Sequence, residues 1–210
     1  MKKSARELKK EAQELRKSGD LDRAGNYYTA AAHEYAGTVT EHIFPEPDHT
    51  YAALTALLRA ATCYRISGDE FRVQNRCELG TLLAEDYIEY IDNQDYREGS
   101  FADLRRGAWF EYIGDLRTVA ERDSADKAYE RAMNIYESAG SDVGFVCAEG
   151  EHMGLARFFM SVRKGLGHEI PRDAPEQPAP GTTFPEWLEY KRERLPELLD
   201  QLEEQGEWPK

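Results

Sequence analysis

The chain has 210 residues, 40% of them hydrophobic, so it is long enough to bury the core of one large domain or two small ones. Its 40 acidic and 27 basic residues give a net charge of −13, and nine lysines stand against eighteen arginines. This charge argues against general binding to nucleic acid or to anionic membranes, whose phosphates would repel the protein. An acidic, lysine-poor composition is typical of proteins adapted to high salt, and an ordinary acidic cytosolic protein is the alternative.

Cysteine usage indicates a reducing compartment. The three cysteines, Cys63, Cys77 and Cys147, are odd in number and show no C-x-x-C spacing, which argues against a disulfide framework. No run approaches the roughly 18 apolar residues that span a bilayer. The basic residues at the N-terminus are not followed by an apolar stretch, so we expect no signal peptide and a cytoplasmic location.

In chain order, the first predicted helix covers residues 5–17 and is opened by a capping box of Ser4 and Glu7. The second predicted helix follows Asp20. Two prolines then predict a loop over residues 37–49. Apolar residues at helical spacing predict five further helices, over residues 50–65, 70–91, 100–120, 125–138 and 142–164.

One string, R-x-S-G-D-x-x-R, occurs twice, beginning at Arg16 and at Arg65, 49 residues apart. Each copy lies between two of the predicted helices, so it predicts the tight turn of a helical hairpin. Its glycine ends the first helix by taking a positive φ, and its aspartate caps the second helix. Asp123 and Ser124 predict the turn of a third hairpin. Repeated hairpins of this kind indicate a helical repeat array, and such arrays mostly bind other proteins.

The last part of the chain differs in composition. Four prolines among residues 165–182 predict an extended linker. A capping box of Thr183 and Glu186 then restarts a helix, which Pro196 should kink or split near Leu195. We therefore expect a helical repeat domain, a proline-rich linker and a C-terminal helix that packs back on the array as a cap, over residues 1–167, 168–182 and 183–210.

The first hairpin resembles a tetratricopeptide repeat. The residues that carry the resemblance are Leu8, Ala12 and Leu15 before the turn and Ala24, Tyr28 and Ala31 after it. The resemblance extends to about residue 140, and the long spacing is similar to the elongated hairpins of the soluble NSF-attachment proteins. It implies an all-α, right-handed superhelical array of antiparallel hairpins. The concave wall of such an array is made by the first helix of each hairpin and takes a peptide or a partner helix.

The resemblance also implies which side chains face the concave wall. In the first two hairpins and the seventh predicted helix they are Lys9, Gln13, Arg16, Thr62, Arg65, Arg157 and Arg163. Their basic groups would bind the carboxylates of an acidic peptide through charge-assisted hydrogen bonds. The alternative is a solvated helix face, or pairing with the abundant acids of the chain itself. The function expected is a non-catalytic adaptor that needs no cofactor.

Two other classes of function stay open. Glu149 and His152 have the E-x-x-H spacing of carboxylate-bridged metalloenzymes, but the only other match ends at His49 in the proline loop, so the ligand set is incomplete. A second candidate metal set lies in that loop and consists of His42, Asp48 and His49. The third class is a self-assembling structural protein that associates through its acidic outer face or through the helix of Trp187. No G-x-S-x-G motif and no glycine-rich phosphate loop occurs in the sequence.

Overall fold

The computed structural model describes residues 3–41, 47–93, 99–139, 150–167 and 183–208. Within these ranges the protein is all-α, as predicted, and no described helix combines the length and apolarity needed to cross a membrane. The helices are α1 (Ala5–Lys17), α2 (Leu21–Glu41), α3 (Pro47–Ile66), α4 (Glu70–Asn93), α5 (Gly99–Val119), α6 (Ala125–Ser138), α7 (Gly150–Gly165) and α8 (Phe184–Gln205).

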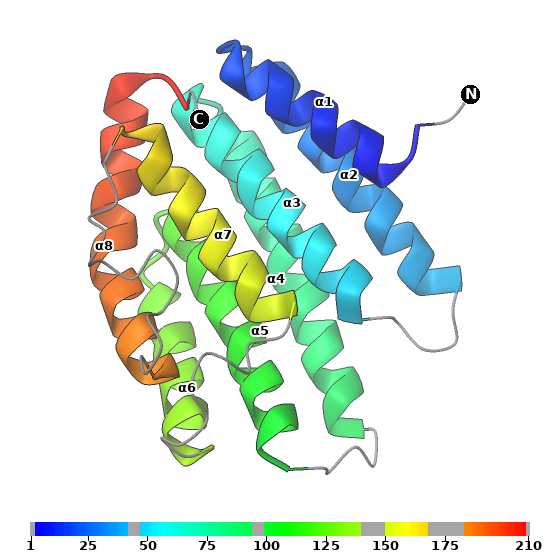
Figure 1. Cartoon of the computed structure of the whole chain (residues 1–210), viewed down its shortest axis with the longest axis vertical. Coiled ribbons are helices and arrows are strands. Elements are labelled where there is room, and N and C mark those ends of the chain that lie inside the picture. Colours follow the sequence, from blue (N-terminus) through cyan, green and yellow to red (C-terminus); the bar gives the residue numbers. More distant parts are fainter. Residues whose placement is uncertain (1–2, 42–46, 94–98, 140–149, 168–182, 209–210) are drawn as a thin grey trace.

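The first six helices form three antiparallel hairpins that stack side by side (Figure 1). Within the hairpins α1 packs on α2, α3 on α4 and α5 on α6, while α2 against α3 and α4 against α5 join one hairpin to the next. Small residues allow the close approach inside these pairs. Gly114 of α5 lies under the ring of Tyr129 of α6, where an added Cβ would come within 2.4 Å of the ring. The neighbouring helix therefore packs directly against the backbone at this position.

The two repeated turns have the predicted geometry. Gly19 has a φ of +82° and Gly68 a φ of +77°, a conformation that glycine adopts without a Cβ clash. At the first turn the N–H of Asp20 donates to the carbonyl of Leu15 at 3.0 Å, and the second turn repeats this bond at 2.9 Å. This six-to-one bond closes a Schellman motif and satisfies carbonyls that the helix end leaves free. The predicted caps are also confirmed, because Asp20 and Asp69 each accept a hydrogen bond from the backbone three residues later.

The third turn has the same geometry without a glycine. Asp123 and Ser124 lie in the turn, as predicted, but the residue with positive φ is Glu121, at +55°. The N–H of Arg122 donates to the carbonyl of Arg117 at 2.9 Å, which is the same six-to-one bond. A glutamate in this conformation costs roughly 1–2 kcal/mol, and nothing in its sequence marks it as a left-handed residue.

Several predicted boundaries need correction. The loop expected over residues 37–49 is shorter, because α2 continues to Glu41 and α3 begins at Pro47. Residues 42–46, the beginning of the predicted seventh helix (142–149) and the linker 168–182 lie outside the described residues. The expected split at Pro196 does not occur, since α8 is one helix from Phe184 to Gln205. The buried leucines on both sides of the proline outweigh its cost of about 3 kcal/mol in a helix interior.

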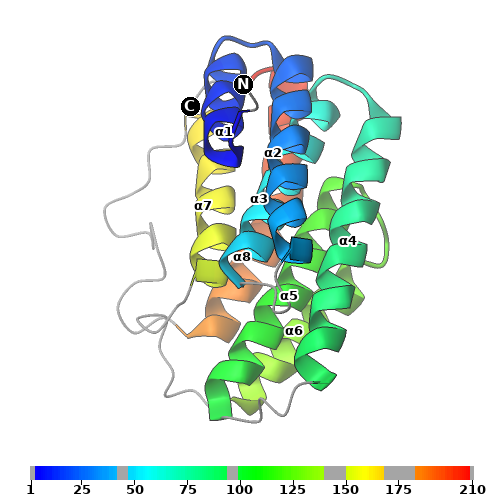
Figure 2. The ribbon, with the colours of Figure 1, turned by 90° about the vertical axis from the view of Figure 1, so that its right-hand side faces the viewer.

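The helix α7 packs against both α3 and α5. Gly154 of α7 sits against the hydroxyls of Tyr112 of α5 and Thr55 of α3, which hydrogen-bond to each other at 2.9 Å. Figure 2 shows α7 at one edge of the molecule and α4 at the other, with α3 and α5 between them. The last helix, α8, packs on α6, α7, α5 and α3. The faces of α3, α5 and α6 that meet α7 and α8 are therefore covered by the protein's own helices.

Candidate functional site

The seven residues predicted for the concave wall differ in burial. Arg16, Thr62, Arg65 and Arg163 are buried, Lys9 and Gln13 are half-buried, and Arg157 is exposed. The hydroxyl of Thr62 is used within its own helix, where it donates to the carbonyl of Leu58 at 2.8 Å. Arg163 packs with its Nη1 buried and without a hydrogen-bond partner among the described residues. The structure thus separates a buried set of side chains from an accessible one.

Two residues of the accessible set, Lys9 on α1 and Arg157 on α7, form what we call the cationic cluster together with Arg59 on α3. In Figure 1, α1 and α7 lie on the two sides of α3. Burial lowers the pKa of Lys9, and the positive charges of Arg59 and Arg157 lower that pKa further. Burial also lowers the pKa of Arg59. Within the described part of the chain, none of the three has a side-chain hydrogen bond or ion pair. The sequence did not single out Arg59, which lies on the mainly apolar α3.

The buried Arg16 meets the residues that follow α8. Its Nη1 donates to the carbonyl oxygen of Trp208 at 3.0 Å, and its guanidinium lies 4.7 Å from the centre of the Trp208 ring. Two kinds of contact, a hydrogen bond and a cation–π interaction, therefore hold the end of α1 to the C-terminal segment.

Trp208 is seated on α7. Its indole N–H donates to the carbonyl of Ser161 at 2.8 Å, and its ring lies against Gly165, where an added Cβ would come within 2.4 Å of the ring. Gly206, with a φ of +69°, ends α8 and turns the chain toward this seat. Trp208 is 1% exposed, so its indole fills the space between α1 and α7.

Arg65 occupies the equivalent position in the second repeated turn, and it also contacts the last helix. It forms ion pairs with Asp200 of α8 at 2.5 Å, with Glu203 of α8 at 2.9 Å and with Glu121 in the third turn at 2.6 Å. These three carboxylates lie near one another as metal ligands would, but all are exposed and each already pairs with the guanidinium of Arg65. The ion pairs of Arg65 therefore link the second hairpin to α8.

The third hairpin is joined to α8 through a buried lysine. Lys191 of α8 is fully buried, and its Nζ donates to Glu111 and, at 2.9 Å, to Asp115, both on α5. The hydroxyls of two tyrosines of α6 complete the network: Tyr129 donates to Asp115 at 2.9 Å and Tyr136 to Glu111 at 2.7 Å. Every carboxylate of this Lys191 network therefore has a cation and a hydroxyl as partners, which buried charges require.

The protonation of the Lys191 network follows from its burial. Burial raises the pKa of Asp115 to about 6, against the stabilising effect of Lys191 and with a further rise due to Glu111. Burial alone would lower the pKa of Lys191, but the two carboxylates outweigh it and raise that pKa. Burial and the neighbouring acids place the pKa of Tyr129 and Tyr136 well above the ordinary value. Lys191 is thus held as a cation and is unavailable as a base.

Of the candidate ligands of the metalloenzyme alternative, the structure describes the side chains of His152 and His49. His152 is buried, and its ring lies 5.9 Å from Tyr136 and 4.4 Å from Phe184 of α8, measured between ring centres. Glu149, His42 and the side chain of Asp48 lie outside the described residues. His49 lies 6.3 Å from the ring of Tyr35. The surroundings of His152 are aromatic, which suits a packed core residue.

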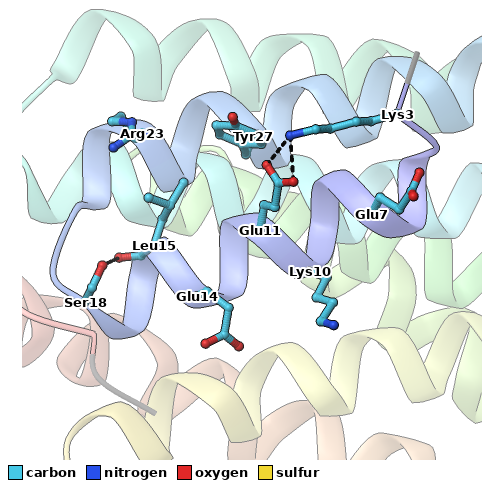
Figure 3. A pocket seen from close by; sticks show the side chains of 9 residues that line it. All are labelled: Lys3, Glu7, Lys10, Glu11, Glu14, Leu15, Ser18, Arg23 and Tyr27. Carbon is cyan, nitrogen blue, oxygen red and sulfur yellow. Dashed lines mark hydrogen bonds and ion pairs between the residues drawn. The ribbon is translucent and has the colours of Figure 1, made fainter. Parts of the chain in front are cut away.

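A hollow of about 700 Å³ lies on the first hairpin (Figure 3). Lys3 reaches across it to Glu11 at 2.6 Å and lies 5.4 Å from the ring centre of Tyr27. Glu14 is paired with Lys17 at 3.1 Å. Because these charges already pair with each other at the surface, a ligand would gain little by replacing their partners.

The chain matches no known protein family, and its comparison with curated proteins and with solved structures finds no match.

Proposed function

We propose that this protein is a non-catalytic, cytoplasmic adaptor that binds an acidic segment of a partner protein at the cationic cluster. In this proposal α1 to α6 form a tetratricopeptide-like, right-handed superhelical array, and α8 is its cap. The observation that carries the proposal is the cationic cluster itself. Lys9, Arg59 and Arg157 act on one another without an acidic partner among the described residues, in a chain whose net charge is −13.

The three cations of the cluster repel one another, and two of them, Lys9 and Arg59, are partly removed from water. Burial and, after it, this repulsion lower the pKa of Lys9. Carboxylates that approach from outside would relieve this repulsion and form charge-assisted hydrogen bonds with the guanidinium groups. The gain is larger here than at a fully exposed site, because Lys9 and Arg59 are half-buried and water screens them less. An acidic peptide should therefore bind more tightly at the cationic cluster than at a fully exposed group of cations.

The test is the fluorescence anisotropy of a labelled ten-residue peptide of alternating glutamate and aspartate, titrated with the full chain. A peptide of the same length made of glutamine and asparagine is the uncharged reference. We expect the acidic peptide to bind more tightly, and its affinity to fall as salt is raised. The double variant Lys9→Glu with Arg157→Glu should abolish binding, because it reverses two of the three charges.

Lys10→Glu is the matched control for this charge reversal. Lys10 is the next residue on α1, is exposed, lines the hollow of Figure 3, and is not one of the three residues of the cationic cluster. It changes the net charge of the protein by the same amount per residue, so it should leave most of the binding intact. Equal affinity for the acidic and the uncharged peptide, or equal losses from Lys10→Glu and Lys9→Glu, would contradict the proposal.

A further inference from the structure

The exposed large apolar side chains of the described residues all lie on one helix, α4. They are Phe71, which is 77% exposed, Leu82, which is 50% exposed, and Leu79, which is 37% exposed. Leu82 follows Phe71 by eleven residues, about three helical turns, so the two side chains leave α4 in the same direction, with Leu79 beside them. Single exposed apolar residues are ordinary, but a group on one face indicates an interaction surface.

This group, which we call the α4 face, points away from the rest of the protein. The buried residues of α4, among them Val73 and Ala84, lie on the opposite side of the helix, which packs mainly on α3 and α5. Figure 2 shows α4 at one edge of the molecule, with α7 at the other. The α4 face is therefore accessible to a partner along the length of the helix.

Every exposed charged side chain of α4 is an acid: Glu70, Glu78, Glu85, Asp86, Glu89 and Asp92. Glu78, Glu85 and Asp92 each pair with an arginine that follows α4 in the chain. The other three, which include Asp86 and Glu89, have no ion pair among the described residues. Asp86 and Glu89 follow Leu82 by four and seven residues, so they continue the α4 face by one and two turns.

The arginines of α4 are half-buried and contact neighbouring groups of the protein. Arg76 donates to the hydroxyl of Thr29 on α2 at 3.0 Å. Arg72 pairs with Asp69 at 3.2 Å, and its guanidinium lies 5.3 Å from the centre of the Tyr64 ring. The exposed surface of α4 therefore combines apolar side chains with charges of one sign.

We propose that the α4 face binds a basic amphipathic helix of a partner protein. The apolar stripe of that helix packs on Phe71, Leu79 and Leu82, and its lysines or arginines lie beside Asp86 and Glu89. Helices commonly recognise partners through such a stripe, with ridges of side chains packed into grooves. The charge selects this occupant over a second copy of the chain, because two copies would bring the same acids together and each has a net charge of −13.

This surface goes beyond the proposed function and shares no residue with the cationic cluster. Figure 2 shows α1 and α7, which carry Lys9 and Arg157, on one side of the molecule and α4 on the other. The protein can therefore hold an acidic segment and a basic helix at the same time, each at a surface of opposite charge.

The test is the fluorescence anisotropy of a labelled peptide of leucine and lysine, titrated with the full chain. The leucines stand at helical spacing, and a length of about 18 residues reaches from Phe71 to Glu89. One reference peptide has the same composition with the leucines distributed around the helix, and the other has glutamate in place of lysine. We expect the amphipathic basic peptide to bind at least about tenfold more tightly than either reference.

Two double variants separate the apolar contribution from the charged one. Phe71→Gln with Leu82→Gln should lower the affinity about tenfold or more at every salt concentration, because it removes the apolar contact. Asp86→Asn with Glu89→Gln should weaken binding mainly at low salt, where charge attraction is least screened. All four side chains are exposed, so both variants should keep the circular dichroism spectrum and the thermal stability of the wild-type protein.

Glu130→Gln with Glu137→Gln is the matched control for the loss of charge. It removes two exposed acids from α6 instead of α4, so it should leave the affinity for the peptide nearly unchanged. Equal losses from the charge variants of α4 and α6 would mean a general attraction to an acidic protein and would overturn the proposal. Equal affinity for the two lysine peptides would overturn it for the same reason.

Sedimentation velocity of the protein alone tests whether a second copy covers the α4 face. We expect a monomer, and a dimer that Phe71→Gln with Leu82→Gln dissociates would replace the proposal with self-association. The acidic peptide of the preceding section is titrated into the same variant and should bind as it does to the wild-type protein. Loss of one kind of binding without the other therefore shows which of the two proposals has failed.

Discussion

Arg16 and Arg65 occupy the same position in the two repeated turns, and both side chains contact the C-terminal part of the chain. Arg16 donates to the carbonyl of Trp208, and Arg65 pairs with Asp200 and Glu203. The repeated turn thus also supplies two equivalent anchor points for the C-terminal segment. In the third hairpin Lys191 reverses the arrangement, since there the cation comes from α8 and the acids come from α5.

Removing the charge of Lys191 should destabilise the protein strongly. Lys191→Met leaves Glu111 and Asp115 buried without a cation, and breaking a buried ion pair in this way costs roughly 3–5 kcal/mol. The free energy of unfolding in urea measures the loss. Arg192→Gln is the neighbouring control, because its partner Asp126 is exposed and the pair should contribute no more than about 1 kcal/mol. Similar losses in the two variants would contradict the importance of the buried network.

The pH dependence of stability should carry a contribution from Asp115. Its pKa rises from the ordinary value of 3.8 to about 6 in the folded protein, so the folded state holds the proton more tightly than the unfolded state. This contribution to stability is complete below pH 3.8 and is lost as the pH rises through about 6. The groups that face Asp115 are Lys191 of α8, Glu111 of α5 and Tyr129 of α6, and the raised pKa of Lys191 lies far above this range.

Urea unfolding of the wild-type protein and of Asp115→Asn across this pH range isolates the effect. The difference between their unfolding free energies should change with pH, with the wild-type protein losing stability relative to the variant as the pH rises. A difference that is constant with pH would mean that folding leaves the pKa of Asp115 unchanged.

The glycines of the repeated turns should be needed for their positive φ and not for space. No atom lies within 4 Å of a Cβ built on Gly68, so Gly68→Ala meets no clash, yet its φ of +77° should cost about 1–2 kcal/mol. A Cβ built on Gly37 also has no atom within 4 Å, but Gly37 lies inside α2 and has no positive φ. Gly37→Ala should therefore stabilise the protein by about 0.5–1 kcal/mol. Thermal unfolding of both variants checks the sign, and a stabilising Gly68→Ala would refute the turn geometry.

Cys63 and Cys77 should be chemically silent in the native protein. Both are free and buried, and burial raises the pKa of each thiol to about 12, so the reactive thiolate is scarce at neutral pH. A thiol reagent should label these two positions only after unfolding, as peptide mapping by mass spectrometry would show. Labelling of Cys63 or Cys77 at a rate typical of exposed cysteines would contradict the packed core around them.

The turns were predictable because glycine and aspartate have local roles that the sequence repeats. The third turn was predictable only in its place, since Glu121 adopts a positive φ without any of the residue types that favour it. The position of α7 was not predictable either. Its apolar residues surround most of the helix, which indicates burial but not the element it packs against.

The candidate site was predictable in part. Of the residues that the resemblance implied, Arg157 lowers the pKa of Lys9 through its charge, whereas Arg16 and Arg65 contact the C-terminal segment, and Arg59 was missed. One signal of the Lys191 network was present in the sequence. Lys191 falls on the apolar stripe of its helix, four residues from both Trp187 and Leu195, where a lysine can stay charged only with buried acids opposite it. The sequence does not say which acids these are.

Each of the three hairpins is fastened to the same C-terminal segment, by Arg16, by Arg65 and by Glu111 with Asp115. In an open solenoid each repeat touches only its neighbours, and the terminal repeats can fray alone. Here the segment that begins with α8 contacts all three hairpins. Melting should therefore proceed as a single all-or-none event, with no stage at which one hairpin has come apart while the others persist.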